Sequence, residues 1–214
     1  MMFDDRQDAG RRLGQRLQTL NLRDPLVLAL PRGGVPVGIE VAKALAAPLD
    51  LVLVRKIGAP GHAELAAGAV VDGSLPELVV NEDVIRSYRI DAAYLEHAKA
   101  RQLEEIERRR RLYLGERTRA PVAGRTAIIV DDGIATGATV RAAMHAVRRA
   151  KPAILVLAVP VAAASTLAEL ATEADRIVCL HQPADLMAVG QYYRDFRQVE
   201  DAEVVAMLAN ATPA

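Results

Sequence analysis

The chain has 214 residues, of which 51% are hydrophobic, 25% are charged and only 3% are aromatic, and its 27 Lys and Arg residues balance 27 Asp and Glu residues. This composition predicts a single domain over residues 1–214 with an aliphatic core, and the balanced charge predicts neither a nucleic-acid partner nor an anionic membrane surface. Cys179 is the single cysteine, which excludes an internal disulfide and a cysteine-based zinc site. No apolar run approaches the roughly 20 residues that cross a bilayer, and the sequence opens on an acidic stretch rather than an apolar leader, so we expect a cytoplasmic protein without membrane contact.

Apolar runs alternate with helical patterns along the first part of the sequence. Leucines at helical spacing indicate a helix, and short continuous apolar runs are typical of strands buried on both faces. The first such run is followed by Pro31-Arg32-Gly33-Gly34, and the second ends at Arg55 and Lys56. The elements in order are a helix over 5–20, a strand over 25–30, a helix over 35–47 and a strand over 49–54.

Residues 57–68 are small and rich in turn formers, with Gly58, Gly61 and Gly68 among them. We expect this segment to be a mobile active-site loop that excludes water when it closes. His62 and Glu64 are its titratable side chains, so they are candidates for proton transfer or for contact with a leaving group. A solvated surface histidine is the alternative for His62.

The rest of the sequence continues the alternation. A long helical pattern over 91–114, with Asp91 as a suitable N-cap, predicts an inserted helix. The segment 190–209 begins with "GQYYRDF" and ends in a helical pattern, which predicts a small hood and a closing helix; a packing turn is the alternative for the aromatic part. The other elements are strands over 77–81, 125–130, 152–160 and 175–180 and helices over 139–150 and 163–171.

This order of elements predicts an α/β fold, a parallel sheet flanked by helices with a Rossmann-like core. Ligands of such sheets bind beyond the carboxyl ends of the strands. Three predicted strands are followed by charged residues or glycines, at Pro31–Gly34, at Arg55-Lys56 and at Asp131-Asp132-Gly133. We expect all three ends to lie along one edge of the sheet.

The loop after the two aspartates combines small residues with hydroxyl donors. Its backbone N–H groups and the start of the next helix predict a cradle for a phosphate, to which Thr136 and Thr139 add hydroxyls. Asp131 and Asp132 accept hydrogen bonds when ionised, which suits the vicinal hydroxyls of a ribose. The loop and the acids together indicate a ribose 5-phosphate site, with a capped strand-to-helix turn as the alternative.

The stretch "IIVDDGIATGAT" resembles the phosphoribosyl pyrophosphate (PRPP) signature of type I phosphoribosyltransferases. The stretches "LPRGGVPVG" and "RKIGAPGHAELAAGAV" resemble a bacterial group of this family whose acceptor is not known. The resemblance implies transfer of the 5-phosphoribosyl group from PRPP to a small-molecule base, release of pyrophosphate, Mg²⁺ as cofactor and a homodimer. It also implies a hood, and an unusual cis peptide bond in the loop after the first strand.

The resemblance also implies roles for individual residues. Asp131 and Asp132 hold the ribose hydroxyls beside the Mg²⁺ ion. Arg32, Gly33 and Gly34 receive the pyrophosphate, whose charge Arg55 and Lys56 help to neutralise. The cradle for the 5-phosphate consists of Gly133, Ile134, Ala135, Thr136, Gly137, Ala138 and Thr139.

Two departures from known patterns narrow the acceptor. Orotate enzymes carry a further lysine between the Arg-Lys pair and the loop histidine, where this chain has Ala59 and Pro60. Hypoxanthine-guanine enzymes place an acid where this chain has Ala135. Orotate and 6-oxopurines are therefore disfavoured.

Arg108–Arg111 is a run of four arginines with Glu104, Glu105 and Glu107 close by. Opposite charges at helical spacing pair with each other, which favours a solvated helix face. The alternative is a PRPP-sensing regulator that binds nucleic acid through these arginines without turnover. A hydrolase or a pure binding module in the same pocket is the third hypothesis.

Overall fold

The computed structural model describes residues 1–72 and 77–211 and contains a five-stranded sheet with the strand order β2-β1-β6-β7-β8. Every pair of neighbouring strands in this sheet runs parallel. The α/β fold that the alternating pattern predicts is therefore confirmed. The strands are β1 (Pro25–Ala29), β2 (Leu49–Leu51), β6 (Thr126–Val130), β7 (Ile154–Val161) and β8 (Arg176–His181).

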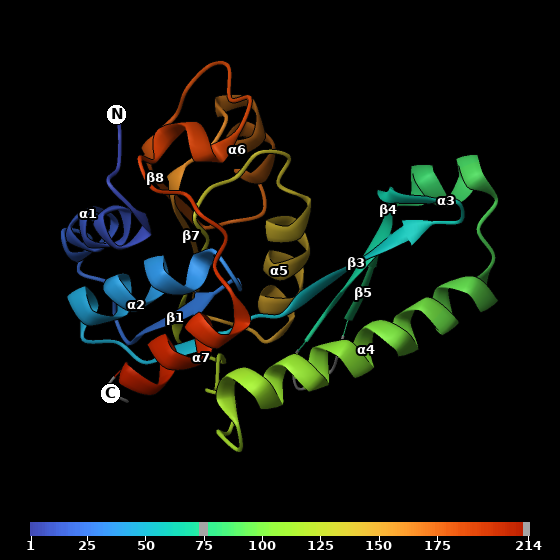
Figure 1. The fold of residues 1–214 in the computed structure, drawn as a ribbon, viewed down its shortest axis with the longest axis horizontal. Helices are drawn as coiled ribbons and strands as arrows, with labels where there is room; N and C mark the ends of the chain where they lie inside the picture. The colour runs from blue at the N-terminus through green and yellow to red at the C-terminus, as the bar shows by residue number, and fades with distance from the viewer. Residues whose placement is uncertain (73–76, 212–214) are drawn as a thin grey trace.

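Helices cover both faces of this sheet (Figure 1). Successive residues of β6 face opposite layers, because Ile129 packs in the same cluster as Met144 of α5 whereas Ile128 packs with Leu13 of α1. The central strands are thus apolar on both sides, which explains their continuous apolar runs. The helices are α1 (Arg6–Gln18) and α2 (Gly34–Leu45) on one face, and α5 (Ala138–Arg149) and α6 (Ala164–Leu170) on the other.

An arm projects from the main sheet (Figure 1). It consists of a second, antiparallel sheet with the order β3-β4-β5 and of two helices. Ile57 of this sheet is buried in one cluster with Ile106 of the long helix and Val204 of the C-terminal helix α7 (Asp201–Asn210). The elements of the arm are β3 (Val54–Ala59), β4 (His62–Val71), β5 (Glu77–Val80), α3 (Glu82–Tyr88) and α4 (Ala92–Leu114), with Asp91 as the N-cap of α4.

The segment over 57–68, which the sequence predicts as a mobile active-site loop, forms most of the β3–β4 hairpin. Gly61 at the turn has a φ of 76°, a conformation that glycine adopts without strain. A Cβ atom on Gly68 would lie 2.6 Å from the carbonyl oxygen of Val79 in β5. Glycine at position 68 therefore permits close approach of a neighbouring strand, which the sequence analysis took for loop flexibility.

A buried ion network joins the arm to the main sheet. Arg110 of α4 donates to Oδ2 of Asp72 at 3.2 Å, and its other terminal nitrogen lies 3.7 Å from Oδ1 of Asp50 in β2. Arg119 also pairs with Asp72, whose Oδ1 accepts a hydrogen bond of 2.8 Å from the backbone of Leu53. Because a buried charge that loses its partner is costly, this network fixes the point where the arm leaves the sheet.

The C-terminal segment returns to the main sheet through a short 3₁₀ helix, η1 (Val189–Tyr192), before α7 begins. The backbone of Phe3 donates to Tyr192 at 2.8 Å and accepts from Arg194 at 2.9 Å, so the start of the chain pairs with the segment that precedes α7. Among the described residues, no helix combines the length and the apolar character that spanning a membrane requires.

Candidate functional site

The adjacent strands β1 and β6 bring two of the expected site loops together. A Cβ atom on Gly33 would lie 2.0 Å from Oδ2 of Asp132, and one on Gly34 would lie 3.0 Å from the Cα atom of Asp131. The loop after β1 therefore lies directly against both carboxylate residues, at a separation that a side chain larger than hydrogen would prevent. This contact is the centre of the candidate site.

The third strand end does not join them as expected. Arg55 and Lys56 lie within β3 of the arm rather than at the end of a main-sheet strand. Arg55 donates to the side chain of Gln102 in α4 at 3.2 Å. Lys56 lines a cavity of about 390 Å³ between the arm and α5, together with Ala138 and Arg141. Lys56 thus faces the start of α5 across this cavity, whereas Arg55 is held on the arm.

Asp132 is half-buried and paired with a cation from the first helix. Nε of Arg6 donates to Oδ2 of Asp132 at 2.7 Å. The hydroxyl of Tyr193 donates to the backbone carbonyl of the same aspartate. Burial raises the pKa of Asp132 above its usual value, and the charge of Arg6 offsets part of that rise. The structure therefore supplies a positive charge on one side of this carboxylate.

Asp131 has no such cation within hydrogen-bond reach among the described residues. Its Oδ1 accepts a hydrogen bond of 2.9 Å from the backbone of Asp132. Burial, and secondarily the negative charge of Asp132, raise the pKa of Asp131 well above its usual range. Two neighbouring carboxylates of this kind are stabilised in the ionised form by hydroxyl donors or by a metal ion.

The loop over 133–139 is exposed where an anion would approach. Ile134 is buried and its N–H donates to the carbonyl of Val161 at 2.9 Å, which anchors the loop on β7. Thr166 of α6 donates to the carbonyl of Ala135 at 2.8 Å. Gly137 adopts a φ of 77° at the N-cap of α5. The exposed residues of the loop are Ala135, Thr136 and Ala138, while Thr139 is half-buried.

Arg32 turns away from the two aspartates. Its Nη1 lies 3.5 Å from Oε2 of Glu200 and 3.5 Å from Oδ1 of Asp201, at the start of α7. The Pro31–Arg32 peptide bond is cis, as the family resemblance implies. Phosphate contact through the Arg32 side chain thus requires release from two long, partly exposed ion pairs, which are weak.

The structure does not bring His62 to the acids. The turn between β3 and β4 lies at the far end of the arm beside α3 (Figure 1), and the His62 ring packs edge-on against Tyr88 with 5.3 Å between the centroids. Glu64 lies in β4, and its side chain is outside the described part of the structure. In this structure His62 therefore lies in the hairpin turn, away from Asp131 and Asp132.

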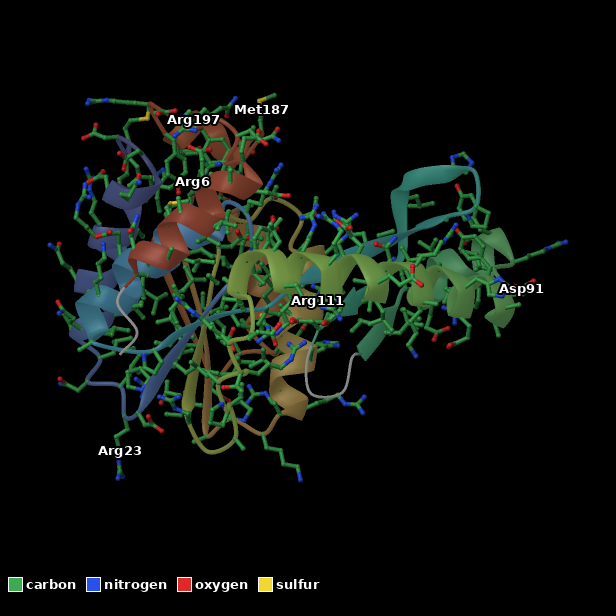
Figure 2. All side chains as sticks on the ribbon, turned by 60° about the horizontal axis from the view of Figure 1, so that its bottom comes forward. Arg6, Arg23, Asp91, Arg111, Met187 and Arg197 are labelled. Carbon is green, nitrogen blue, oxygen red and sulfur yellow. The ribbon has the colours of Figure 1, made fainter. Side chains whose placement is uncertain are left out.

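The segment expected to form a hood does contact the site. A Cβ atom on Gly133 would lie 2.4 Å from the side chain of Val189. The guanidinium of Arg6 lies over the ring of Phe196, 3.9 Å from its centroid, and donates to the carbonyl of Arg197 at 2.9 Å. Figure 2 shows Arg6 and Arg197 close together beside the C-terminal segment. Residues 189–197 therefore form one wall beside Asp132.

Arg6 and Thr166 contact the site but were not predicted from the sequence. Arg6 is 126 positions from Asp132 along the chain, and its local sequence resembles the start of any charged helix. Thr166 lies in a short apolar helix and carries no motif. No signal in a single sequence identifies either residue, because each contact arises only when distant elements pack together.

The four consecutive arginines of α4, Arg108–Arg111, are all paired within the chain. Arg108 and Arg109 donate to Glu105, and Arg111 donates to Glu107. Hydrogen bonds from Arg108 and Arg109 lower the pKa of Glu105 to about 2. Arg110 belongs to the buried network with Asp72. The run is therefore mostly a solvated helix face with internal partners, not a free basic patch.

The described residues contain no group of three or more His, Cys, Asp or Glu side chains that could hold a metal ion. Asp131 and Asp132 supply only two carboxylates. This donor set fits Mg²⁺, which commonly binds proteins through one or two carboxylates and takes its other ligands from water and substrate phosphates. Asp131 and Asp132 are the residues that would hold it.

Comparisons with known proteins agree with this geometry. The model of the phosphoribosyl transferase domain matches residues 5–195. Two proteins of Mycobacterium tuberculosis, from strains CDC 1551 and H37Rv, are 50% identical to the chain over 210 residues; the second is named "Putative phosphoribosyl transferase Rv0571c". The match covers 98% of this chain and 47% of each relative, so the chain spans about half their length. The crystal structure of TT1426 from Thermus thermophilus is 45% identical, covers 99% of both chains and has a TM-score of 0.82.

Proposed function

Because the chain belongs to the phosphoribosyl transferase family, we propose that it transfers the 5-phosphoribosyl group of PRPP to a nitrogenous acceptor and releases pyrophosphate. The observation that carries this proposal is the packing of Gly33 against the carboxylate of Asp132, directly before the loop over 133–139. It leaves a diol-binding pair of acids between two backbone loops, each suited to a phosphate.

Each part of PRPP has matching residues. Asp131 and Asp132 accept hydrogen bonds from the ribose hydroxyls. The exposed backbone of the loop over 133–139 and the first turn of α5 bind the 5-phosphate. Gly33 and Gly34 bring backbone close to the pyrophosphate, and Arg32 grips it after leaving Glu200 and Asp201.

In the transfer, the bond from the anomeric carbon to pyrophosphate breaks and a bond from that carbon to an acceptor nitrogen forms. Positive charge grows on the sugar ring, beside the carboxylates of Asp131 and Asp132, which stabilise it. Negative charge grows on the leaving group, toward Arg32 and, across the cavity, Lys56. When bound, Mg²⁺ supplies charge neutralisation of the pyrophosphate. Closure of the arm would bring Arg55, His62 and Glu64 nearer to these groups.

The acceptor is a small-molecule base that meets the wall formed by residues 189–197. Ala135 stands where an acid would select a 6-oxopurine, which disfavours that class. We also propose a homodimer, which the family resemblance implies, and a cytoplasmic location, which was expected from the sequence. Sedimentation of the purified chain tests the dimer.

The test of the function begins with calorimetry of the wild-type protein with PRPP and Mg²⁺, followed by a panel of bases assayed for pyrophosphate release. We expect PRPP binding and turnover with at least one base. Asp132→Asn should lower kcat/KM by about 100-fold or more while the protein stays folded, because the amide keeps the shape of the side chain but lacks the negative charge that stabilises the developing positive charge on the sugar. Glu116→Gln, a change at an exposed site on the linker after α4, is the control.

Absence of both PRPP and pyrophosphate binding would refute the proposal. Binding of PRPP without turnover for any base would instead support a sensor. Because Arg108–Arg111 have internal partners, the nucleic-acid-binding form of that alternative requires RNA or DNA binding that Arg109→Gln abolishes at physiological salt.

A further inference from the structure

We propose that Arg6 is a positioning residue for Asp132, holding one carboxylate oxygen so that the other is presented to the sugar of the substrate. This inference rests on the proposed function and deepens it, because it assigns a role to a residue outside the signature loop. Arg6 lies in the first turn of α1, and its side chain is only 10% exposed.

Three contacts fix the guanidinium of Arg6. Nε donates to Oδ2 of Asp132 at 2.7 Å, and Nη1 donates to the carbonyl of Arg197 at 2.9 Å. The ring of Phe196 supports its flat face at 3.9 Å. A charge-assisted hydrogen bond, a second acceptor and a ring together determine both the position and the plane of the group.

The elements that carry Arg6 are themselves held closely. A Cβ atom on Gly14 of α1 would lie 2.6 Å from the Cβ atom of Ala44 in α2, so these two helices are in near backbone contact. α2 begins at Gly34, directly after the loop that lies against Asp132. A shift of α1 would therefore have to move the pyrophosphate loop as well.

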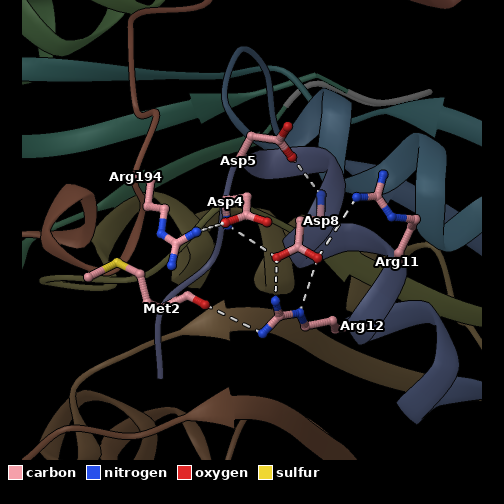
Figure 3. A network of polar contacts seen from close by, with 7 residues as sticks. All are labelled: Met2, Asp4, Asp5, Asp8, Arg11, Arg12 and Arg194. Carbon is pink, nitrogen blue, oxygen red and sulfur yellow. Dashed lines mark hydrogen bonds and ion pairs between the residues drawn. The ribbon is translucent and has the colours of Figure 1, made fainter.

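The polar network at the start of α1 adds a second restraint (Figure 3). Asp5 caps the helix by accepting from the backbone of Asp8 at 2.7 Å, and Asp8 pairs with Arg12 one turn later. Arg194 donates to Asp4 at 2.7 Å, which ties this network to the C-terminal segment. Arg6 thus lies where the first helix and the wall over 189–197 meet.

In this arrangement Arg6 bonds to one of the two carboxylate oxygens of Asp132. Oδ2 is taken by Arg6, while Oδ1 accepts no hydrogen bond from another residue in the described ranges 1–72 and 77–211. Tyr193 holds the backbone of the same residue through its carbonyl. Backbone and side chain are therefore fixed by separate groups, and the second carboxylate oxygen is the one that we assign to a sugar hydroxyl.

The test compares Arg6→Gln and Arg6→Lys with Arg16→Gln, a matched control on the same helix whose exposed side chain donates to Thr19 and lies outside the network of Figure 3. Calorimetry measures three probes, namely PRPP and ribose 5-phosphate in the presence of Mg²⁺ and pyrophosphate in its absence. Thermal unfolding of each variant checks that it is folded.

We expect Arg6→Gln to weaken PRPP and ribose 5-phosphate by about 10- to 100-fold. Binding of pyrophosphate, measured without Mg²⁺ so that the metal does not link it to the two acids, should stay unchanged. Arg6→Lys should restore part of the loss, because it returns the charge without the second donor. A merely structural role would weaken all three probes together or none of them.

The outcomes separate the two proposals. If the wild-type protein binds none of the probes, the proposed function fails and the role of Arg6 falls with it. If the wild type binds them and either folded Arg6 variant binds PRPP equally well, only the inference on Arg6 is refuted. Tighter binding of PRPP by the variants would also overturn the inference, because Arg6 would then hold the carboxylate of Asp132 away from the substrate. If Arg6→Gln does not fold, Arg6→Lys carries the test alone.

Discussion

Gly33 packs so closely against the carboxylate of Asp132 that a Cβ atom on Gly33 would lie 2.0 Å from Oδ2 of the aspartate. Gly33 itself has a φ of −61° and a ψ of −34°, which any residue adopts. Glycine is therefore required here by its neighbour and not by its backbone conformation.

We predict that Gly33→Ala weakens PRPP binding by about 100-fold, because the added methyl group displaces the carboxylate from the sugar site. Calorimetry with PRPP and Mg²⁺ measures the loss. In an Asp132→Ala background the same change should have little further effect, since the atom it displaces is gone. An additive loss in the double variant would contradict this explanation.

Thr166 supports the phosphate loop from α6 through its hydrogen bond of 2.8 Å to the carbonyl of Ala135. Thr166→Val keeps the shape of the buried side chain but leaves that carbonyl without this donor, so we expect a loss of about 1 kcal/mol in the free energy of unfolding. The affinity for ribose 5-phosphate should fall several-fold in the same variant. Ser165→Ala, a change at the exposed neighbouring position, is the control and should alter neither quantity.

Asp72 is the buried acid to which Arg110 and Arg119 converge. Asp72→Ala removes an ion-pair partner of the buried guanidinium of Arg110, so we expect the free energy of unfolding to fall by about 3–5 kcal/mol. The double variant Asp72→Leu with Arg110→Leu should recover much of this loss, because it removes both charges. Urea unfolding of the three proteins measures the coupling, and equal stability of the single and double variants would refute it.

Cys179 has a pKa raised to about 11, chiefly by burial. At pH 8 its thiol therefore stays protonated, and we expect iodoacetamide to label the native protein at least about 10-fold more slowly than the protein in urea. Between pH 9 and pH 11 the folded state retains this proton while the unfolded chain releases it, so the free energy of unfolding should fall with rising pH in this window. Cys179→Ala should remove that component of the pH dependence. Rapid labelling of the native thiol would contradict the prediction.

The central part of the site is readable from the sequence because its determinants are local. A continuous apolar run gives a strand buried on both faces, and parallel pairing places the carboxyl ends of adjacent strands together. These rules place the ends of β1 and β6 at one edge of the sheet, and the structure places the two strands next to each other. The signature over 128–139 then indicates what that contact is for.

The arm could not be read in the same way. Small residues over 57–68 are compatible with a flexible loop and with a tightly packed hairpin, and the choice depends on what packs against them. In the structure, β5 approaches Gly68 and α4 covers Ile57, so the hairpin forms. The charges of Arg55 and Lys56 consequently lie on the arm.

By itself, the sequence determined the parallel sheet, the order of its elements and the pairing of two acids with a phosphate-sized loop, since hydrophobic periodicity and loop composition act over a few neighbouring residues. Only the tertiary structure decided that Arg6 holds Asp132, that Arg32 turns to α7 and that His62 lies at the end of an arm. Those relationships join segments far apart along the chain, and their energies depend on burial and close packing that exist only in the folded molecule.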